Sequence, residues 1–280
     1  MKCKISRLND ELEELIIKYR RAGYSLDEIS EKMQIYKNTL IAFLENNNIV
    51  VPREEYPSFK INGRKILVIS DSHIGSMYQN LKYIDEAYNV GLKEGVCACV
   101  HAGDLFQGKL FDLDDKINNQ IETFNLFYPK VSEFITKVGL GNHDYWFFKQ
   151  LKKSPDFIEN RDDIELYGYR RLFFDWNNYM FAIDHGNKYY KDFVRKESYA
   201  LCFAGHGHEL QVSNEGATKV RVGAVCDDIK KEKAFPGFII ATLDGNIIII
   251  DSYCFKNEKA KLMKKEYFIK EFNEYHKVRR

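Results

Sequence analysis

The sequence lacks a long hydrophobic run, a strong net charge and a dense set of cysteines, and each absence excludes a class of protein. No stretch approaches the roughly 18 consecutive apolar residues that a membrane-spanning helix needs. The N-terminal residues show neither the apolar core nor the small-residue cleavage site of a signal peptide. We therefore expect a cytoplasmic protein that has no membrane partner.

The charge and the cysteines exclude two further classes. The formal net charge is +1, so the chain as a whole offers no broad basic surface to nucleic acid. Its six cysteines lie mostly within apolar runs, which suits reduced core residues better than a disulfide framework. What is present is 45% hydrophobic and 14% aromatic residues in a chain of 280, enough to bury a large core. The length suggests one sizeable domain and a small one.

Residues 1–52 differ from the rest because they read as three short helices separated by turns. Ser25 and Glu28 have the spacing of a capping box at the start of the second helix. The arrangement resembles the helix-turn-helix of site-specific recombinases and transcription factors. It predicts that the third helix contacts nucleic acid through its first residues, Lys37, Asn38 and Thr39. The alternative is a module for protein interaction or dimerisation.

Residues 53–63 are expected to form a linker, and residues 64–255 the main domain, where short apolar strands alternate with helical segments. The sequence PGFIIATLDGNIIIIDSY predicts a hairpin that turns at Asp244 and Gly245. Residues 256–280 carry nine Lys or Arg against four Glu. We expect them to form a solvated basic helix or tail.

Polar residues gather where the predicted strands of the main domain end. Ligands of open α/β folds bind at the carboxyl ends of the strands, so these side chains are candidates for one site. They supply carboxylate, imidazole and carboxamide groups without thiolate, which favours Mn, Fe or Zn over a cysteine-based structural site. The residues at the strand ends are Asp71, His73, Asp104, Asn142, His143, Asp144, His185, His206 and His208.

Any one of these residues alone would be ordinary turn chemistry, because Asp and Asn commonly follow strands. Five groups in succession, each directly after a strand, are much harder to reach by chance. His101 lies inside its strand and His276 near the end of the chain. We interpret both as structural or solvent-facing.

The order of these groups resembles the motif series of the calcineurin-like metallophosphoesterases. The series appears as Asp71-Ser72-His73, Gly103-Asp104, Gly141-Asn142-His143-Asp144, His185 and Gly205-His206-Gly207-His208. The resemblance implies an α/β fold in which a β-sandwich is flanked by helices, here joined to the small all-α helix-turn-helix module. It also implies two divalent metal ions, with manganese preferred and iron, zinc or nickel as alternatives.

Carried over by position, the resemblance assigns a role to each residue. One ion would take Asp71, His73, Asp104 and His208, and the other Asp104, Asn142, His185 and His206. Two ions about 3.5–4 Å apart can activate water and clamp the phosphoryl oxygens. The catalytic residues would be His143, as proton donor to the leaving oxygen, and Asp144, which would hold the His143 ring.

The substrate is less defined than the site. Protein phosphatases of this superfamily follow the bridging aspartate with an Asp-Arg pair that grips phosphate, whereas this chain has Gln107 and Gly108 there. We therefore expect a phosphodiesterase or nuclease that acts on a nucleic acid or nucleotide. The alternatives are a phosphomonoesterase for phosphoproteins or small molecules, and a DNA-binding regulator with a vestigial phosphoesterase domain. The oligomeric state stays open.

Overall fold

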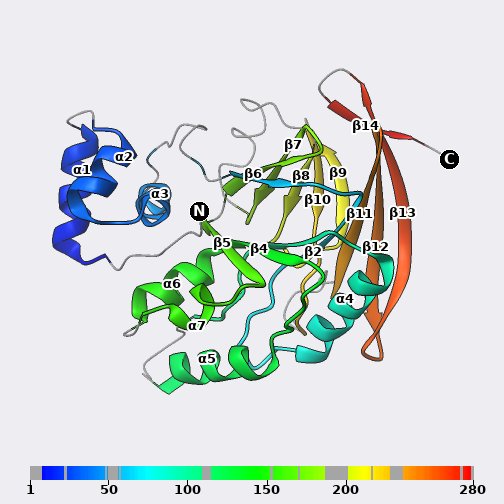
Figure 1. The fold of residues 1–280 in the computed structure, drawn as a ribbon, viewed down its shortest axis with the longest axis horizontal. Helices are drawn as coiled ribbons and strands as arrows, with labels where there is room; N and C mark the ends of the chain where they lie inside the picture. The colour runs from blue at the N-terminus through cyan, green and yellow to red at the C-terminus, as the bar shows by residue number, and fades with distance from the viewer. Residues whose placement is uncertain are drawn as a thin grey trace.

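The computed structural model describes residues 8–21, 24–47, 49, 56, 58–108, 115–151, 154–169, 171–186, 201–215, 217–227, 236–271 and 274–278. Two β-sheets pack face to face, and helices cover both outer faces (Figure 1). This is the helix-flanked β-sandwich that the sequence predicts. Within these residues, no helix combines the length and the apolar character required to cross a bilayer.

The larger sheet has eight strands, in the order β14-β13-β12-β11-β2-β3-β4-β5. Four neighbouring strands are parallel: β2 (Lys65–Ile69), β3 (Ala98–Ala102), β4 (Ile135–Leu140) and β5 (Ile164–Tyr169). The other four are antiparallel: β11 (Gly237–Asp244), β12 (Ile247–Lys256), β13 (Lys259–Glu271) and β14 (Glu274–Val278). The predicted hairpin is β11–β12. Its two turn residues are Gly245 and Asn246, one position later than expected.

The smaller sheet has six strands, in the order β1-β6-β7-β8-β10-β9. They are β1 (Ser58–Ile61), β6 (Arg171–Trp176), β7 (Tyr179–Asp184), β8 (Cys202–Ala204), β9 (Gln211–Glu215) and β10 (Ala217–Arg221). Alternate residues point inward, so Phe174, Phe181 and Phe203 meet Val68 and Val100 of the larger sheet in one buried cluster. The five described cysteines are free thiols, as expected.

The outer face of the larger sheet is covered by α4 (Leu81–Glu94), α5 (Asp115–Phe127), α6 (Asn142–Gln150) and α7 (Asp156–Glu159) (Figure 1). Aromatic residues dominate this layer. Phe106, for example, stacks on Phe147 of α6 with ring centroids 4.1 Å apart. Because α6 begins directly after β4, its first residues stand at the carboxyl end of the parallel strands.

The N-terminal module consists of α1 (Asp10–Arg21), α2 (Leu26–Met33) and α3 (Lys37–Asn46). The capping box is present: the Ser25 N–H donates to Glu28 at 2.7 Å, and the Glu28 N–H donates to Ser25 Oγ at 3.2 Å. The module packs against the main domain. Its apolar side chains share one cluster with Phe173, Ala182 and Cys202, which lie on the outer face of the smaller sheet.

The position of α3 argues against a recognition helix. Every residue from Leu40 to Glu45 is buried, since α3 packs against α2 on one side and against β5 on another. Of the three residues expected to touch nucleic acid, Thr39 is buried and Lys37 forms an ion pair with Asp27 at 3.0 Å. Asn38 is half-buried on the same turn. A helix enclosed in this way cannot enter a DNA groove without leaving its core.

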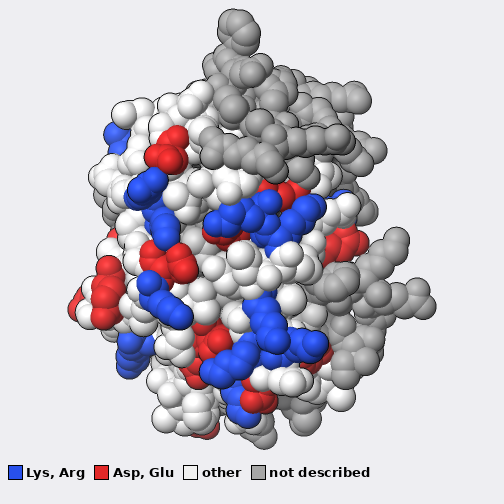
Figure 2. All heavy atoms as spheres, turned by 90° about the vertical axis from the view of Figure 1, so that its right-hand side faces the viewer, with Lys and Arg blue, Asp and Glu red and all other residues white. Residues whose placement is uncertain are grey.

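The C-terminal segment also differs from expectation, because residues 259–271 and 274–278 form β13 and β14 instead of a helix or tail. Similarly, residues 58–61 of the expected linker form β1, which pairs with β6. The lysines of β13 are largely neutralised. Lys259 pairs with Glu86, Lys264 with Glu266 and Lys265 with Asp251. Figure 2 accordingly shows basic and acidic side chains interspersed on this face of the molecule.

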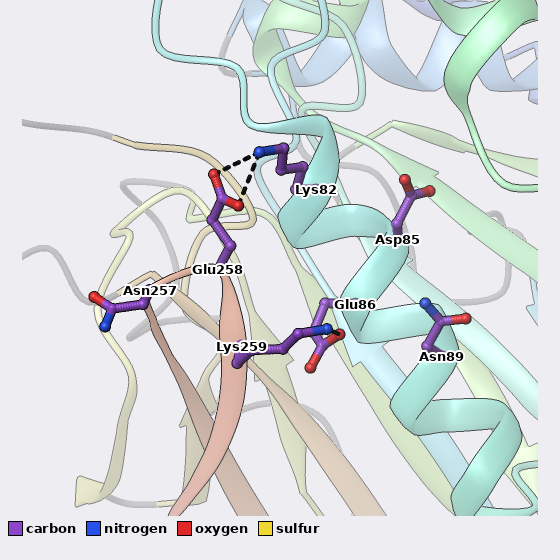
Figure 3. A pocket seen from close by; sticks show the side chains of 7 residues that line it. All are labelled: Lys82, Asp85, Glu86, Asn89, Asn257, Glu258 and Lys259. Carbon is purple, nitrogen blue, oxygen red and sulfur yellow. Dashed lines mark hydrogen bonds and ion pairs between the residues drawn. The ribbon is translucent and has the colours of Figure 1, made fainter.

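A shallow pocket of about 220 Å³ lies between α4 and the turn that joins β12 to β13 (Figure 3). Its walls carry both signs of charge. Lys82 points at Glu258, with both carboxylate oxygens 2.8–2.9 Å away, and Lys259 points at Glu86. These pairs involve four of the five charged side chains in the wall, the fifth being Asp85. The pocket contains none of the residues predicted for the metal site.

Candidate metal centre

Five strand ends from both sheets deliver the predicted ligands to one place. Strands β2, β3 and β4 of the larger sheet end just before Asp71, Asp104 and Asn142, and strands β7 and β8 of the smaller sheet end just before His185 and His206. Side chains from these ends and from the start of α6 form three overlapping groups that could hold a metal ion. The first cluster is Asp71, His73 and His208, and the second cluster is Asp104, His185 and His206. The third group, His73, Asp104 and His143, lies between them.

The first cluster is closely packed and almost fully buried. The Nε2 atoms of His73 and His208 lie 3.3 Å apart. They lie 3.7 Å and 3.2 Å, respectively, from Oδ1 of Asp71. Three donor atoms from three side chains therefore face one small volume, as the ligands of a single cation do.

The second cluster is joined to the first through Asp104. Asp104 Oδ2 lies 2.8 Å from Nε2 of His185 and 3.9 Å from Nε2 of His73. Asp104 therefore stands between the two groups, the position expected of a bridging carboxylate. Asn142 begins α6 next to His143, whose N–H donates to Asp104 Oδ1 at 2.8 Å. Asn142, the remaining predicted ligand, is thus the direct neighbour of the residue that contacts the Asp104 carboxylate.

The backbone at these positions adopts a conformation that non-glycine residues rarely take. Five of the predicted ligands have positive φ: Asp71 (54°), His73 (44°), Asp104 (55°), His206 (66°) and His208 (55°). Each such residue costs on the order of 1–3 kcal/mol and persists only where the surrounding structure enforces it. Strain of this kind, repeated at successive strand ends, is characteristic of functional sites.

The residues present fit divalent cations. His185 Nδ1 donates to the Ala102 carbonyl at 2.6 Å, so its Nε2 carries a lone pair that faces Asp104. Two electron-rich atoms 2.8 Å apart need a cation or a proton between them. Burial disfavours the charged form of the His185 imidazole. The carboxylates of Asp104 and Asp71 favour that form more strongly and so raise the pKa of His185. Among the described residues, neither carboxylate contacts a Lys or Arg that could neutralise it.

His143 lies at the edge of this centre, and its ring meets that of His73 edge-on with centroids 4.8 Å apart. Its Nδ1 donates to the backbone carbonyl of Gln107 at 2.7 Å. This contact fixes the tautomer, because a carbonyl accepts only from a protonated nitrogen. The nitrogen left for chemistry is therefore Nε2.

Asp144 does not hold the His143 ring, contrary to the role predicted for it. Its carboxylate instead accepts the backbone N–H groups of Leu105, Phe106 and Gly141 at 3.1, 2.7 and 2.8 Å. These bonds connect the loop after β3 to the start of α6. Burial and the nearby Asp104 raise the pKa of Asp144 to about 6. Asp144 thus fixes the backbone that presents Asp104 and His143.

Sequence reasoning missed His101, which we interpreted as structural or solvent-facing. The side chain is fully buried beneath the centre. Its Nδ1 accepts the N–H of Gly103 at 3.2 Å, and its Nε2 lies 2.6 Å from Ser72 Oγ. Burial lowers the pKa of His101 to about 3, so the ring stays neutral. His101 thereby links the loops that carry Asp71 and Asp104.

Similarity to solved structures extends over most of the chain. Vacuolar protein sorting 29 from Cryptosporidium parvum is 15% identical, with a TM-score of 0.49, and the match covers 74% of this chain and 99% of that one. A novel archaeal phosphodiesterase is 20% identical, with a TM-score of 0.43 and coverage of 65% and 93%. YfcE, a phosphoesterase from E. coli, is 14% identical, with a TM-score of 0.42 and coverage of 72% and 97%.

No curated protein sequence matches this chain significantly. The family profile of the calcineurin-like phosphoesterase superfamily domain matches residues 65–246, which include every ligand in both clusters. The profile thus spans more than half of the chain, from β2 to the turn after β11. The chain therefore belongs to the calcineurin-like phosphoesterase superfamily and is a hydrolase that acts on phosphate esters.

Proposed function

We propose that the protein is a dinuclear metal-dependent phosphodiesterase that acts on a nucleotide or nucleic acid. The observation that carries the proposal is the position of Asp104 between the two clusters of ligand atoms. One ion would be held by Asp71, His73, His208 and Asp104, and the other by Asp104, Asn142, His185 and His206. When bound, the two ions would supply an activated water nucleophile and would neutralise the phosphoryl oxygens.

The chain's own residues would complete the reaction. His143, held through Nδ1, would direct a proton from Nε2 to the oxygen that leaves. The N–H of His143 would hold Asp104 Oδ1, and so keep the bridging carboxylate aligned with the proton donor. Asn142 and His143 are half-buried. Water would therefore have limited access to them, while a polymer could still reach them.

The preference for a diester is supported by the charge of the site. A monoester is a dianion at neutral pH, and its second charge is commonly met by an arginine. Gly108 stands at the position of that arginine, and the backbone carbonyl of the neighbouring Gln107 is occupied by His143. A diester carries one negative charge and needs no such partner.

The test is hydrolysis of bis-(p-nitrophenyl) phosphate and p-nitrophenyl phosphate by protein that has been stripped with chelator and reloaded with Mn²⁺. We expect no turnover without metal, two ions per chain after reloading, and faster hydrolysis of the diester. Asp104→Asn should lose both ions. Equal rates for stripped and reloaded protein would refute the metal mechanism, and a large preference for the monoester would favour the phosphomonoesterase alternative.

A further inference from the structure

Helix α6 exposes one large aromatic side chain beside the metal centre. Its other aromatic residues, Tyr145, Phe147 and Phe148, are buried, whereas Trp146 is 50% exposed. Residues three and four apart on a helix are neighbours on its surface, so Trp146 stands one turn from both His143 and Asn142. One turn of helix advances about 5.4 Å. The open indole therefore borders the place where the ester bond would be cleaved.

The indole is held in place on the side away from solvent. The Lys149 ammonium lies 5.7 Å from the centroid of the Trp146 ring, and the Tyr145 ring meets the indole edge-on at 5.4 Å. Lys149 is itself fixed by Glu13 of α1, 2.9 Å away. A fixed aromatic ring loses little conformational freedom when a ligand stacks on it. The N-terminal module thus contributes to the rim of the site through Glu13.

We propose that Trp146 is a stacking surface for a nucleobase of the substrate, and that the substrate is an unpaired nucleotide strand or a small nucleotide diester. This inference rests on the proposed phosphodiesterase function. In a nucleotide, the sugar separates the phosphate from its base. That separation is comparable to one helical turn, the distance along α6 between His143 and Trp146. Each base has a π-face, so stacking on Trp146 accepts all of them. Bases in a duplex are already stacked, which favours single strands.

The catalytic test compares two substrates with the same leaving group. Thymidine 5′-(p-nitrophenyl) phosphate carries a base, and methyl p-nitrophenyl phosphate does not. Trp146→Ala should lower the ratio of their kcat/KM values by roughly 5- to 100-fold, the range expected for the loss of one stacked base. Trp146→Tyr should retain most of the ratio. The matched control is Phe127→Ala, which removes an exposed aromatic from the far end of α5 and should leave the ratio unchanged.

A second measurement separates this inference from the proposed function. The chain has two tryptophans, and Trp176 is fully buried, so quenching of fluorescence by a ligand reports on Trp146. Oligothymidylate added to chelated protein should quench the emission, more strongly than duplex DNA of the same length, and Trp146→Phe should abolish the effect. Quenching without hydrolysis would support the stacking surface while refuting the diesterase. An unchanged substrate ratio without quenching would overturn the stacking surface and leave Trp146 a contact for a protein partner.

Discussion

His143 has its Nδ1 committed to the Gln107 carbonyl, so a substitution at this position tests proton donation by Nε2. His143→Gln should keep the metal content near that of the wild type and lower kcat by roughly 10²–10⁴-fold. The loss should be smaller for a nitrophenyl leaving group than for an alkyl one, because a good leaving group needs little protonation. Metal analysis together with kcat for the two diesters checks this. Equal losses would mean that His143 does not donate a proton.

Gly141 tests how closely Asp104 must be approached. A methyl group on Gly141 would lie 2.1 Å from Asp104 Oδ1, although its φ of −92° suits any residue. Gly141→Ala should therefore displace the bridging carboxylate and weaken metal binding at least tenfold, as measured by titration with Mn²⁺. The control is Gly95→Ala, where the added methyl meets nothing within 4 Å but the φ of +67° strains the backbone, so stability should fall while metal affinity stays unchanged. Wild-type metal affinity in Gly141→Ala would show that Asp104 can shift without loss.

The sequence predicted that the candidate ligands lie together better than it predicted their supporting contacts. Apolar strands directly precede Asp71, Asp104 and His185, and this pattern can be recognised from the sequence alone. The partner of His143 is a backbone carbonyl, which has no sequence signature, so Asp144 was assigned the role that Gln107 performs. His101 could have been suspected, since a histidine inside an apolar strand must find buried partners.

At the scale of elements, a buried charge network joins α3 to the strand that precedes His185. Arg171 of β6 lies 3.6 Å from Asp184 of β7 and 4.0 Å from Glu45 of α3. Tyr56 donates to Glu45 at 2.8 Å, and all four side chains are buried. Breaking such a network leaves charges without a partner in a medium of low dielectric constant. Helix α3 is therefore tied electrostatically to the element that delivers a metal ligand.

Arg171→Ala should lower the free energy of unfolding by about 3–5 kcal/mol, because it strands the carboxylates of Asp184 and Glu45. Chemical denaturation measures the change. The matched control is Arg64→Ala, which removes an exposed pair with Asp244 at 3.1 Å and should have little effect. Similar losses in both variants would show that the buried pair has no special importance.

The surroundings of α3 and the structure of the C-terminal segment differ from expectation for a common reason, although α3 itself was predicted as a helix. Leu40, Ile41, Phe43 and Leu44 occupy more than one side of α3, a pattern that indicates a helix buried on several sides. The lysines of the C-terminal segment suggested a solvated helix, whereas three of them form ion pairs on β13, an interior strand of the larger sheet. In both cases the local sequence pattern was compatible with two structures, and contacts with the rest of the protein determined which one forms.

At the scale of the whole molecule, the N-terminal module completes the core. Deleting residues 1–52 would expose Phe173, Ala182 and Cys202 on the smaller sheet, together with the charged pair of Arg171 and Asp184. We expect the truncated protein to aggregate or to unfold at a clearly lower temperature. Light scattering and a thermal melt check this. A monodisperse fragment that melts at the wild-type temperature would show that the module is an independent domain.

The order of synthesis gives this packing a further consequence. Helices α1 to α3 are synthesised before the smaller sheet, and their partner Cys202 is made more than 150 residues later. At about 5–20 residues per second, the apolar faces of these helices wait on the order of ten seconds or longer before β8 exists. During that time they are surfaces that a chaperone can bind. Formation of β8 thus covers apolar helix surface that has been exposed since its synthesis, and β9 and β10 complete the smaller sheet afterwards.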